Sequence, residues 1–128
     1  MAVILIVEDE LMIRLFSEQM FTDWGHTTLE AGDIDEALAH LHSPHHIDVL
    51  FTDIRLKAAL QGGYEIAHRA IQLRPQLRVL YTSGNLISDK TWALFVKGAE
   101  YLQKPYTEAG LQKSIAGLLS APGGQLAG

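Results

Sequence analysis

The sequence predicts an α/β protein: a parallel sheet of five strands, made by five consecutive βα units and covered by helices on both faces. Short apolar runs alternate with longer amphipathic segments five times along the 128 residues. Glycines, prolines and small polar residues separate the runs from the segments. The first run, residues 2–7, is continuously apolar, as in strands covered on both faces. Alternation at this spacing is typical of a parallel sheet with crossover helices.

The first half of the chain accounts for three strands and two helices. The strands are expected at residues 2–7, 26–31 and 47–52. The first helix, expected at residues 11–24, stops before Gly25, because glycine suits the left-handed position that follows many helices. Asp33 and Glu36 have the spacing of a capping box at the start of the second helix.

The second half of the chain repeats this alternation. Strands are expected at residues 78–82 and 100–103, and helices at 64–73, at 89–97 and after Thr107. Pro75 prevents the third helix from continuing past Arg74. Gly98 is expected to stop the fourth helix. On that helix the spacing of Trp92 and Phe95 predicts two core-facing aromatic residues.

Composition and charge narrow the classes of function. The chain has no cysteine, which excludes disulfides, thiolate chemistry and cysteine-bound metals. A net charge of −5 argues against a nucleic-acid surface, because phosphate binding needs clustered Lys and Arg. No apolar run approaches the roughly 20 residues of a membrane helix. Met1 leads directly into the first strand without the features of a signal peptide. We expect one cytoplasmic domain at residues 1–119 and a flexible tail at residues 120–128.

Polar side chains follow four of the five expected strands. Glu8 and Asp9 follow the first strand, Asp53 the third, Ser83 the fourth and Lys104 the fifth. Ligands of such sheets bind beyond the carboxyl ends of the strands, so these side chains are expected to meet. Clustered carboxylates need a cation, and their oxygen atoms suit Mg²⁺. A carboxylate beside Mg²⁺ can attack phosphorus, and an ammonium and a hydroxyl can stabilise the phosphoryl oxygens.

Residues 2–119 resemble the receiver domain of two-component response regulators, the family of the bacterial chemotaxis response regulator. The resemblance is carried by four stretches in order: Val7-Glu8-Asp9-Glu10, Thr52-Asp53-Ile54-Arg55-Leu56, Tyr81-Thr82-Ser83-Gly84 and Lys104-Pro105. It implies a flavodoxin-like sheet with the strand order 2-1-3-4-5. It also implies a stand-alone regulator, because no output domain is expected within the 128 residues.

The resemblance implies a role for each acidic position. Asp53 would accept a phosphoryl group from a histidine of a sensor kinase or of a histidine phosphotransfer protein. Asp9 would bind Mg²⁺ directly and Glu8 would bind it through water. The Asp53 carboxylate and the Arg55 backbone carbonyl would be further ligands, and Mn²⁺ can substitute for Mg²⁺.

The resemblance also implies a switch. Ser83 and Lys104 would hold the phosphoryl oxygens. Tyr101 matches the aromatic residue that turns inward when the hydroxyl residue moves toward the phosphate. This change would alter the surface of the fourth helix, the fifth strand and the fifth helix, where an unidentified downstream protein would bind. A plain core-filling role is the alternative for Tyr101.

The sequence departs from the family pattern at three places. Glu8 stands where Asp is common, Lys57 stands where Pro is usual, and the loop at residues 57–61 is longer than the commonest version. The first change alters metal geometry, and the other two affect the dynamics of the loop and its fit to partners. Arg55 and Asn85 border the path of hydrolytic water in this family, so we expect them to tune the rate of phosphate loss.

Other residues have simpler interpretations. Thr82 competes with Ser83 as the site hydroxyl, but neighbouring strand residues point to opposite sides. Glu10, Arg14 and Lys97 are expected to be solvated charges. Four histidines have irregular spacing around a proline, which favours a solvated loop over a metal site; they are His40, His42, His45 and His46.

The first helix offers a similar choice for Leu11 and Leu15. Their simplest assignment is the core of the domain. In the receiver family this helix commonly docks the kinase or the phosphotransfer protein. An exposed Leu11 would therefore be a partner contact.

We expect a phosphorylation-controlled switch that catalyses its own phosphorylation and dephosphorylation without being a conventional enzyme, as a monomer or a phosphorylation-dependent dimer. An interaction module that never carries phosphate is the alternative, against which the complete set of acid, hydroxyl and lysine argues. A hydrolase of the haloacid dehalogenase type needs a D-x-D nucleophile after the first strand, where this chain has Glu8-Asp9-Glu10.

Overall fold

Five parallel strands form one sheet in the computed structural model, which describes residues 1–57, 59–85 and 87–120. The strand order is β2-β1-β3-β4-β5, which confirms the expected flavodoxin-like topology. β1 lies between β2 and β3, with Leu5 opposite Leu29 of β2 on one side and Leu50 of β3 on the other. The strands are β1 (Val3–Val7), β2 (Thr27–Ala31), β3 (Val49–Asp53), β4 (Arg78–Ser83) and β5 (Glu100–Gln103).

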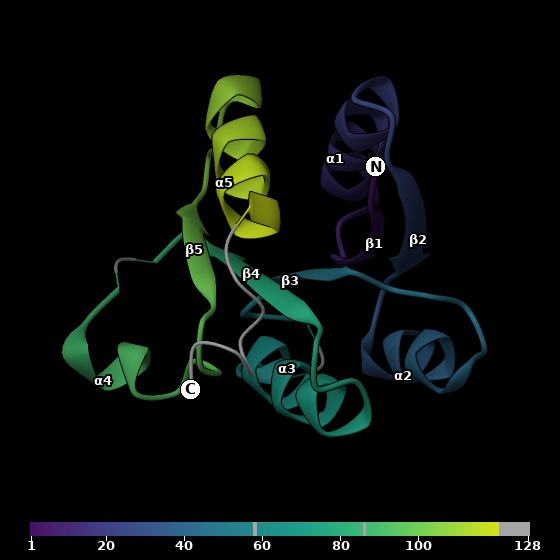
Figure 1. The fold of residues 1–128 in the computed structure, drawn as a ribbon. Coiled ribbons are helices and arrows are strands. Elements are labelled where there is room, and N and C mark those ends of the chain that lie inside the picture. Colours follow the sequence, from purple (N-terminus) through teal and green to yellow (C-terminus); the bar gives the residue numbers. More distant parts are fainter. Residues whose placement is uncertain (58, 86, 121–128) are drawn as a thin grey trace.

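Helices cover both faces of the sheet (Figure 1). One face carries α1 (Leu11–Asp23) and α5 (Glu108–Ser120). The other carries α2 (Ile34–His42) and α3 (Gly62–Leu73), and the short α4 (Asp89–Trp92) lies between β4 and β5 in the chain. Ser120 belongs to α5, and the rest of the expected tail lies outside the described residues. Across the described ranges, none of the helices combines the length and apolar character needed to span a membrane.

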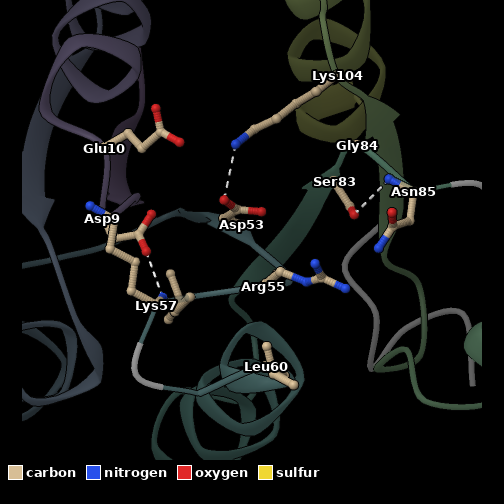
Figure 2. A pocket seen from close by; sticks show the side chains of 11 residues that line it. Asp9, Glu10, Asp53, Arg55, Lys57, Leu60, Ser83, Gly84, Asn85 and Lys104 are labelled. Atoms are coloured by element: carbon tan, nitrogen blue, oxygen red, sulfur yellow. Dashed lines mark hydrogen bonds and ion pairs between the residues drawn. The ribbon is translucent and has the colours of Figure 1, made fainter.

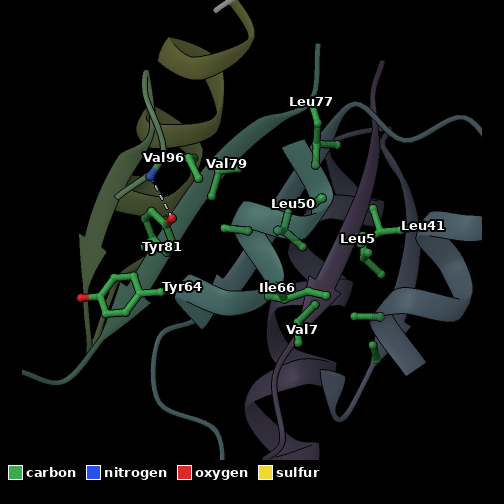
Figure 3. Close-up of a cluster of buried hydrophobic side chains, with 14 of the residues drawn as sticks. Leu5, Val7, Leu41, Leu50, Tyr64, Ile66, Leu77, Val79, Tyr81 and Val96 are labelled. Carbon is green, nitrogen blue, oxygen red and sulfur yellow. Dashed lines mark hydrogen bonds between the residues drawn. The ribbon is translucent and has the colours of Figure 1, made fainter. Parts of the chain in front are cut away.

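The apolar strands contribute to two hydrophobic cores, one on each side of the sheet. On the side of α1 and α5, the strand residues are Ile4, Ile6, Val49, Phe51 and Leu80. On the side of α2 and α3 (Figure 3), they are Leu5, Val7, Leu50, Val79 and Tyr81. Consecutive residues alternate between the cores because strand side chains point to opposite sides of the sheet. This alternation explains why the runs are apolar throughout.

The fourth helix is shorter than the sequence predicted. α4 ends at Trp92, five residues before the expected end at Lys97, because the chain turns inward there. The backbone N–H of Val96 donates to the Tyr81 hydroxyl at 3.1 Å (Figure 3). The Phe95 ring packs on Tyr81, with ring centroids 4.4 Å apart. Phe95 is half-buried as expected, whereas the expectation of a core-facing Trp92 is wrong, because 52% of its surface is exposed.

The first helix also differs from the prediction. The core was the simplest assignment for Leu11 and Leu15, with an exposed Leu11 as the alternative. Four large apolar side chains of this helix expose between 41% and 75% of their surface: Leu11, Met12, Leu15 and Phe16. The core side of α1 is instead formed by Met20 and Phe21 near its end. The amino-terminal half of α1 therefore carries apolar side chains on its solvent-facing side as well, and this side is an exposed hydrophobic surface.

The start of α3 lies directly against the end of β3. The Gly63 backbone N–H donates to the Ile54 carbonyl at 2.9 Å. A Cβ atom at Gly63 would lie 2.6 Å from Ile54 Cα and still closer to the Asp53 carbonyl oxygen. The absence of a side chain at residue 63 therefore lets α3 approach the backbone that presents Asp53.

We expect Gly63→Ala to lower the free energy of unfolding by about 1–3 kcal/mol, because the added methyl group forces α3 away from β3. Denaturant unfolding measures this change. Gly117→Ala on α5 is the matched control, since a Cβ there meets nothing within 4 Å. It should stabilise the protein by about 0.5–1 kcal/mol. A stability of Gly63→Ala equal to that of wild type would contradict the tight contact.

Candidate functional site

The carboxyl ends of β1, β3, β4 and β5 meet at one edge of the sheet and form a pocket (Figure 2). Its volume is about 280 Å³. Asp53 lies at its centre, with Lys104 reaching toward it from the end of β5 (Figure 2). The pocket lining also includes Asp9, Glu10, Arg55, Leu56, Lys57, Leu60, Ser83, Gly84 and Asn85. Fold and sequence motifs therefore place the predicted site residues together.

Three carboxylates and one ammonium form the charged centre of the site. Glu8, Asp9 and Asp53 each offer an oxygen atom, and these atoms lie within 4.8 Å of one another. Lys104 Nζ donates to Glu8 Oε1 at 2.8 Å and to Asp53 Oδ2 at 2.9 Å. Glu8 and Asp53 are buried, while Asp9 is partly exposed.

Burial dominates the electrostatics of this centre. It raises the pKa of Glu8 and of Asp53 above their ordinary values, and hydrogen bonds from Lys104 offset only part of the effect. Burial alone would lower the pKa of Lys104, but its hydrogen bonds to both acids and their charges raise it instead. The two acids are therefore short of positive charge although Lys104 binds both of them.

The donor set fits a small divalent cation. Mg²⁺ prefers carboxylate oxygens and keeps several waters, and the cluster of three acids lies at a pocket of about 280 Å³ that has room for both. Asp9 and Asp53 border that pocket, whereas buried Glu8 lies behind them. A cation there would supply the positive charge that the buried acids lack.

Ser83 and Thr82 have different environments at the end of β4. Ser83 borders the pocket, and its Oγ accepts a hydrogen bond from the Asn85 backbone N–H at 3.1 Å (Figure 2). Thr82 does not border the pocket. Its Oγ1 is buried and, among the described residues, lacks a hydrogen-bond partner. The geometry favours Ser83 as the site hydroxyl, which stays a prediction.

Tyr101 is connected to the same strand end. Its hydroxyl lies 3.0 Å from the Ser83 carbonyl oxygen and 2.7 Å from the Asn85 carbonyl oxygen, so both can accept its hydrogen bond. The ring is half-buried and lies 6.2 Å from that of Phe95. Tyr101 is therefore tied by its hydroxyl to the chain at the end of β4 and just beyond it. Arg55 borders the pocket on the Asn85 side (Figure 2).

Two supporting contacts were not foreseen. The expectation that Arg14 is a solvated charge is wrong: its Nη1 donates to the Glu8 carbonyl at 2.7 Å, and its Nε to Glu30 Oε1 at 3.2 Å. Helical side chains lean toward the amino terminus, so a residue early in α1 can reach the turn before it. The second contact is from the Lys57 backbone N–H to Asp9 Oδ2, at 2.6 Å.

Tyr106 also lies near the site, although the sequence analysis did not single it out. Burial raises its pKa to about 12, with the charges of Glu8 and Asp53 adding to the effect. Its ring packs against Phe51, with centroids 5.9 Å apart. The phenol therefore stays neutral and forms part of the wall beside the charged centre.

Two of the histidines around the end of α2 form hydrogen bonds with residues near them in the fold. His40 Nε2 lies 2.9 Å from the Glu30 carbonyl oxygen, and His46 Nε2 lies 2.7 Å from Asp48 Oδ1. Over the described ranges, the acids of the site are the group whose side chains converge as metal ligands. These histidines are thus paired locally, at a distance from the pocket.

The fold agrees with that of known proteins. The sequence model of the response regulator receiver domain matches residues 4–116. A response regulator receiver protein from Sinorhizobium medicae is 30% identical over 94% of this chain and 95% of that one, with a TM-score of 0.83. A receiver domain protein from Methanospirillum hungatei is 25% identical over 91% of this chain and 92% of that one, with a TM-score of 0.81.

The chemotaxis protein CheY4 from Vibrio cholerae shares the fold, with 22% identity, coverage of 92% and 98%, and a TM-score of 0.81. No curated protein matches the sequence. The chain belongs to the response regulator receiver domain family of two-component signalling. Members of this family generally bind Mg²⁺ at an acidic pocket, which corresponds here to the cluster of Glu8, Asp9 and Asp53.

We expect Asp53→Asn to stabilise the metal-free protein at pH 7 by an amount on the order of 1 kcal/mol. A carboxyl with a raised pKa contributes stability below its unfolded pKa and loses it as pH rises through the folded pKa. The ordinary pKa values of Glu8 and Asp53 are 4.5 and 3.8, and folding raises both. Wild type therefore loses this stability as the pH rises above about 4. Urea unfolding in chelator across pH 4–7 measures the difference, and a wild-type advantage that grows with pH would contradict it.

Proposed function

We propose that this chain is a phospho-accepting response regulator in which Asp53 receives a phosphoryl group from a histidine of a sensor kinase or phosphotransfer protein. The observation that carries the proposal is the arrangement of Asp53. It borders the pocket beside two further acids and is hydrogen-bonded to Lys104. Such an arrangement suits a carboxylate nucleophile that attacks phosphorus.

The transfer would use the groups of the pocket, bound Mg²⁺ and the phosphohistidine donor. An oxygen of ionised Asp53 attacks phosphorus, the phosphorus–nitrogen bond of the phosphohistidine breaks, and its electron pair stays on the imidazole. Lys104 lies where it can hold a phosphoryl oxygen, and Ser83 offers a hydroxyl on the side of Asp53 away from Asp9 (Figure 2). Bound Mg²⁺ would neutralise charge on these oxygens. We assign its ligands to Asp9, Asp53 and the Arg55 backbone carbonyl, with Glu8 acting through water.

Hydrolysis would return the protein to its starting state. Water attacks phosphorus, the bond to the Asp53 oxygen breaks, and inorganic phosphate leaves. Arg55 and Asn85 line the pocket on one side (Figure 2), where we propose that incoming water would pass. Their side chains are therefore placed to tune the lifetime of the phosphorylated protein.

The same strand end would transmit the change to a surface. Movement of Ser83 toward a phosphoryl group would shift its carbonyl, to which the Tyr101 hydroxyl donates. Tyr101 and the exposed Trp92 are joined through Phe95, whose ring lies 4.7 Å from that of Trp92. The surface of α4, β5 and α5 would then differ between the two states for a downstream protein.

The donor would dock on α1. Four apolar side chains of α1 are exposed (Leu11, Met12, Leu15 and Phe16), and one of them, Phe16, lines an apolar groove of about 500 Å³. Phe16 and Lys104 both line this groove, so it lies beside the Asp53 pocket. An amphipathic helix placed there would bring a histidine toward Asp53. Cytoplasmic action on protein partners, without nucleic acid or membrane, completes the proposal.

A phosphorylation-independent interaction module is the second candidate, favoured by the same exposed surface of α1. The two candidates differ in whether Asp53 carries phosphate. Incubation with acetyl phosphate and Mg²⁺ should yield a phosphoryl adduct by intact-protein mass. We expect none for Asp53→Ala and none in chelator. An absent adduct in wild type, together with no binding of beryllofluoride, would reject the regulator in favour of the module.

We expect Phe16→Ala to slow phosphorylation by a phosphorylated histidine phosphotransfer domain by about tenfold, the size of a modest interface hot spot. Its rate with acetyl phosphate should stay within about twofold of wild type, because the small donor needs no docking surface. Leu73→Ala is the matched control, since Leu73 is a similarly exposed apolar residue on α3, on the other face of the sheet. Equal slowing with both donors would place Phe16 in the pocket chemistry instead.

A further inference from the structure

We infer that the backbone N–H of Lys57 positions Asp9 as a metal ligand, so that the β3–α3 loop sets the affinity of the site for Mg²⁺. The inference rests on the proposed function, in which Asp9 binds the cation directly. It concerns a backbone group of the loop where this chain has Lys57 in place of the usual proline.

The contact itself is strong for a backbone hydrogen bond. Lys57 N lies 2.6 Å from Asp9 Oδ2, and bonds to charged acceptors are shorter and stronger than neutral ones. In the described part of the chain it is the hydrogen bond that holds the Asp9 side chain. Glu8 and Asp53 differ, because Lys104 binds both of them. The orientation of Asp9 therefore depends on the loop.

The loop is built to present this N–H group. Leu56 and Ala59 exchange two backbone hydrogen bonds of 3.0 Å each, which close a tight turn around Lys57. Gly62 packs beneath this turn, where a Cβ would lie 2.9 Å from Leu56 Cδ1. The Lys57 side chain is exposed. The part of Lys57 that the site uses is thus its backbone, as Figure 2 shows.

Open space lies behind the contact. Asp9, Leu56 and Lys57 line both the site pocket and a neighbouring recess of about 430 Å³. The hydrogen bond between Asp9 and Lys57 therefore forms part of the boundary between the two. Without this hydrogen bond, the Asp9 carboxylate can rotate into the recess and away from Asp53. Its ligand oxygen is then no longer held in position for the cation. Hydrogen bonds to metal ligands typically change metal affinity about 10–100-fold when removed.

Lys57→Pro and Lys57→Ala separate the backbone from the side chain. Proline removes the N–H group. It suits this turn because Leu56, the residue before it, forms a β-bridge with Ala59, and because Lys57 does not have a positive φ. Alanine removes the side chain and keeps the N–H group. Isothermal titration of Mg²⁺ into the full chain should show a Kd raised about tenfold for Lys57→Pro. For Lys57→Ala the Kd should stay within about twofold of wild type, because the N–H donor is retained.

Three results would overturn the inference. Lys57→Pro with wild-type affinity would show that the N–H group does not matter. Lys57→Ala as weak as Lys57→Pro would assign the effect to the ammonium. Wild type without measurable Mg²⁺ binding would remove the metal site itself, and thus the proposed function together with the inference.

Amide hydrogen exchange gives a second test that needs no proline variant. The Lys57 N–H should exchange at least tenfold more slowly in metal-free wild type than in Asp9→Ala, in which its acceptor is gone. Neighbouring amides of α3 serve as the internal control for global stability. Equal exchange of the Lys57 N–H in the two proteins would overturn the inference even if Lys57→Pro failed to fold.

Discussion

The Lys104 ammonium, held between the buried carboxylates of Glu8 and Asp53, is the interaction on which the site depends. It joins the end of β5 to the ends of β1 and β3 through bonds of 2.8 and 2.9 Å. Two buried acids with a single cation remain electrostatically unsatisfied, since burial still raises the pKa of both. The domain thus folds around a local deficit of positive charge, which is the condition for recruiting a further cation.

Two separate hydrophobic cores keep the strand ends in register. β1 and β3 are buried on both sides, so neither can slide without moving apolar side chains in both cores at once. β4 adds a polar connection, because the Tyr81 hydroxyl accepts the Val96 N–H within the core. That contact draws Phe95 inward and leaves Trp92 at the surface. The position of the α4 region is in this way tied to the strand that carries Ser83.

The sequence was sufficient for the strand order, through the family resemblance, and for the convergence of the site. Strand ends can be predicted because a continuous apolar run followed by an acid or a lysine is a local pattern. The failures had non-local causes. α4 is short because Phe95 packs on Tyr81 of β4. Arg14 has a structural role because it forms an ion pair with Glu30 of β2. Neither partner is near in sequence.

The sequence could not decide between a buried and an exposed start of α1 for a related reason. Helical periodicity identifies one apolar face, whereas the start of α1 is apolar over more than one face, and the fold decides which of them is buried. Similarly, no side-chain pattern predicts the contact between Asp9 and Lys57, because the donor is a backbone group. What sequence patterns miss here are contacts that depend on the meeting of distant segments.

The loop between β3 and α3 begins and ends at the same place. The Ile54 N–H donates to the Thr82 carbonyl, while the Ile54 carbonyl accepts from the Gly63 N–H, both at 2.9 Å. The chain therefore leaves the sheet at Ile54 and is hydrogen-bonded back to the same residue at Gly63. Loop-closure entropy grows slowly with length, so residues can be inserted or removed within this loop at small cost while Asp53 stays in place. Length variation beyond Lys57 therefore offers evolution a way to change recognition while Asp53 and the contact from Lys57 to Asp9 keep their places.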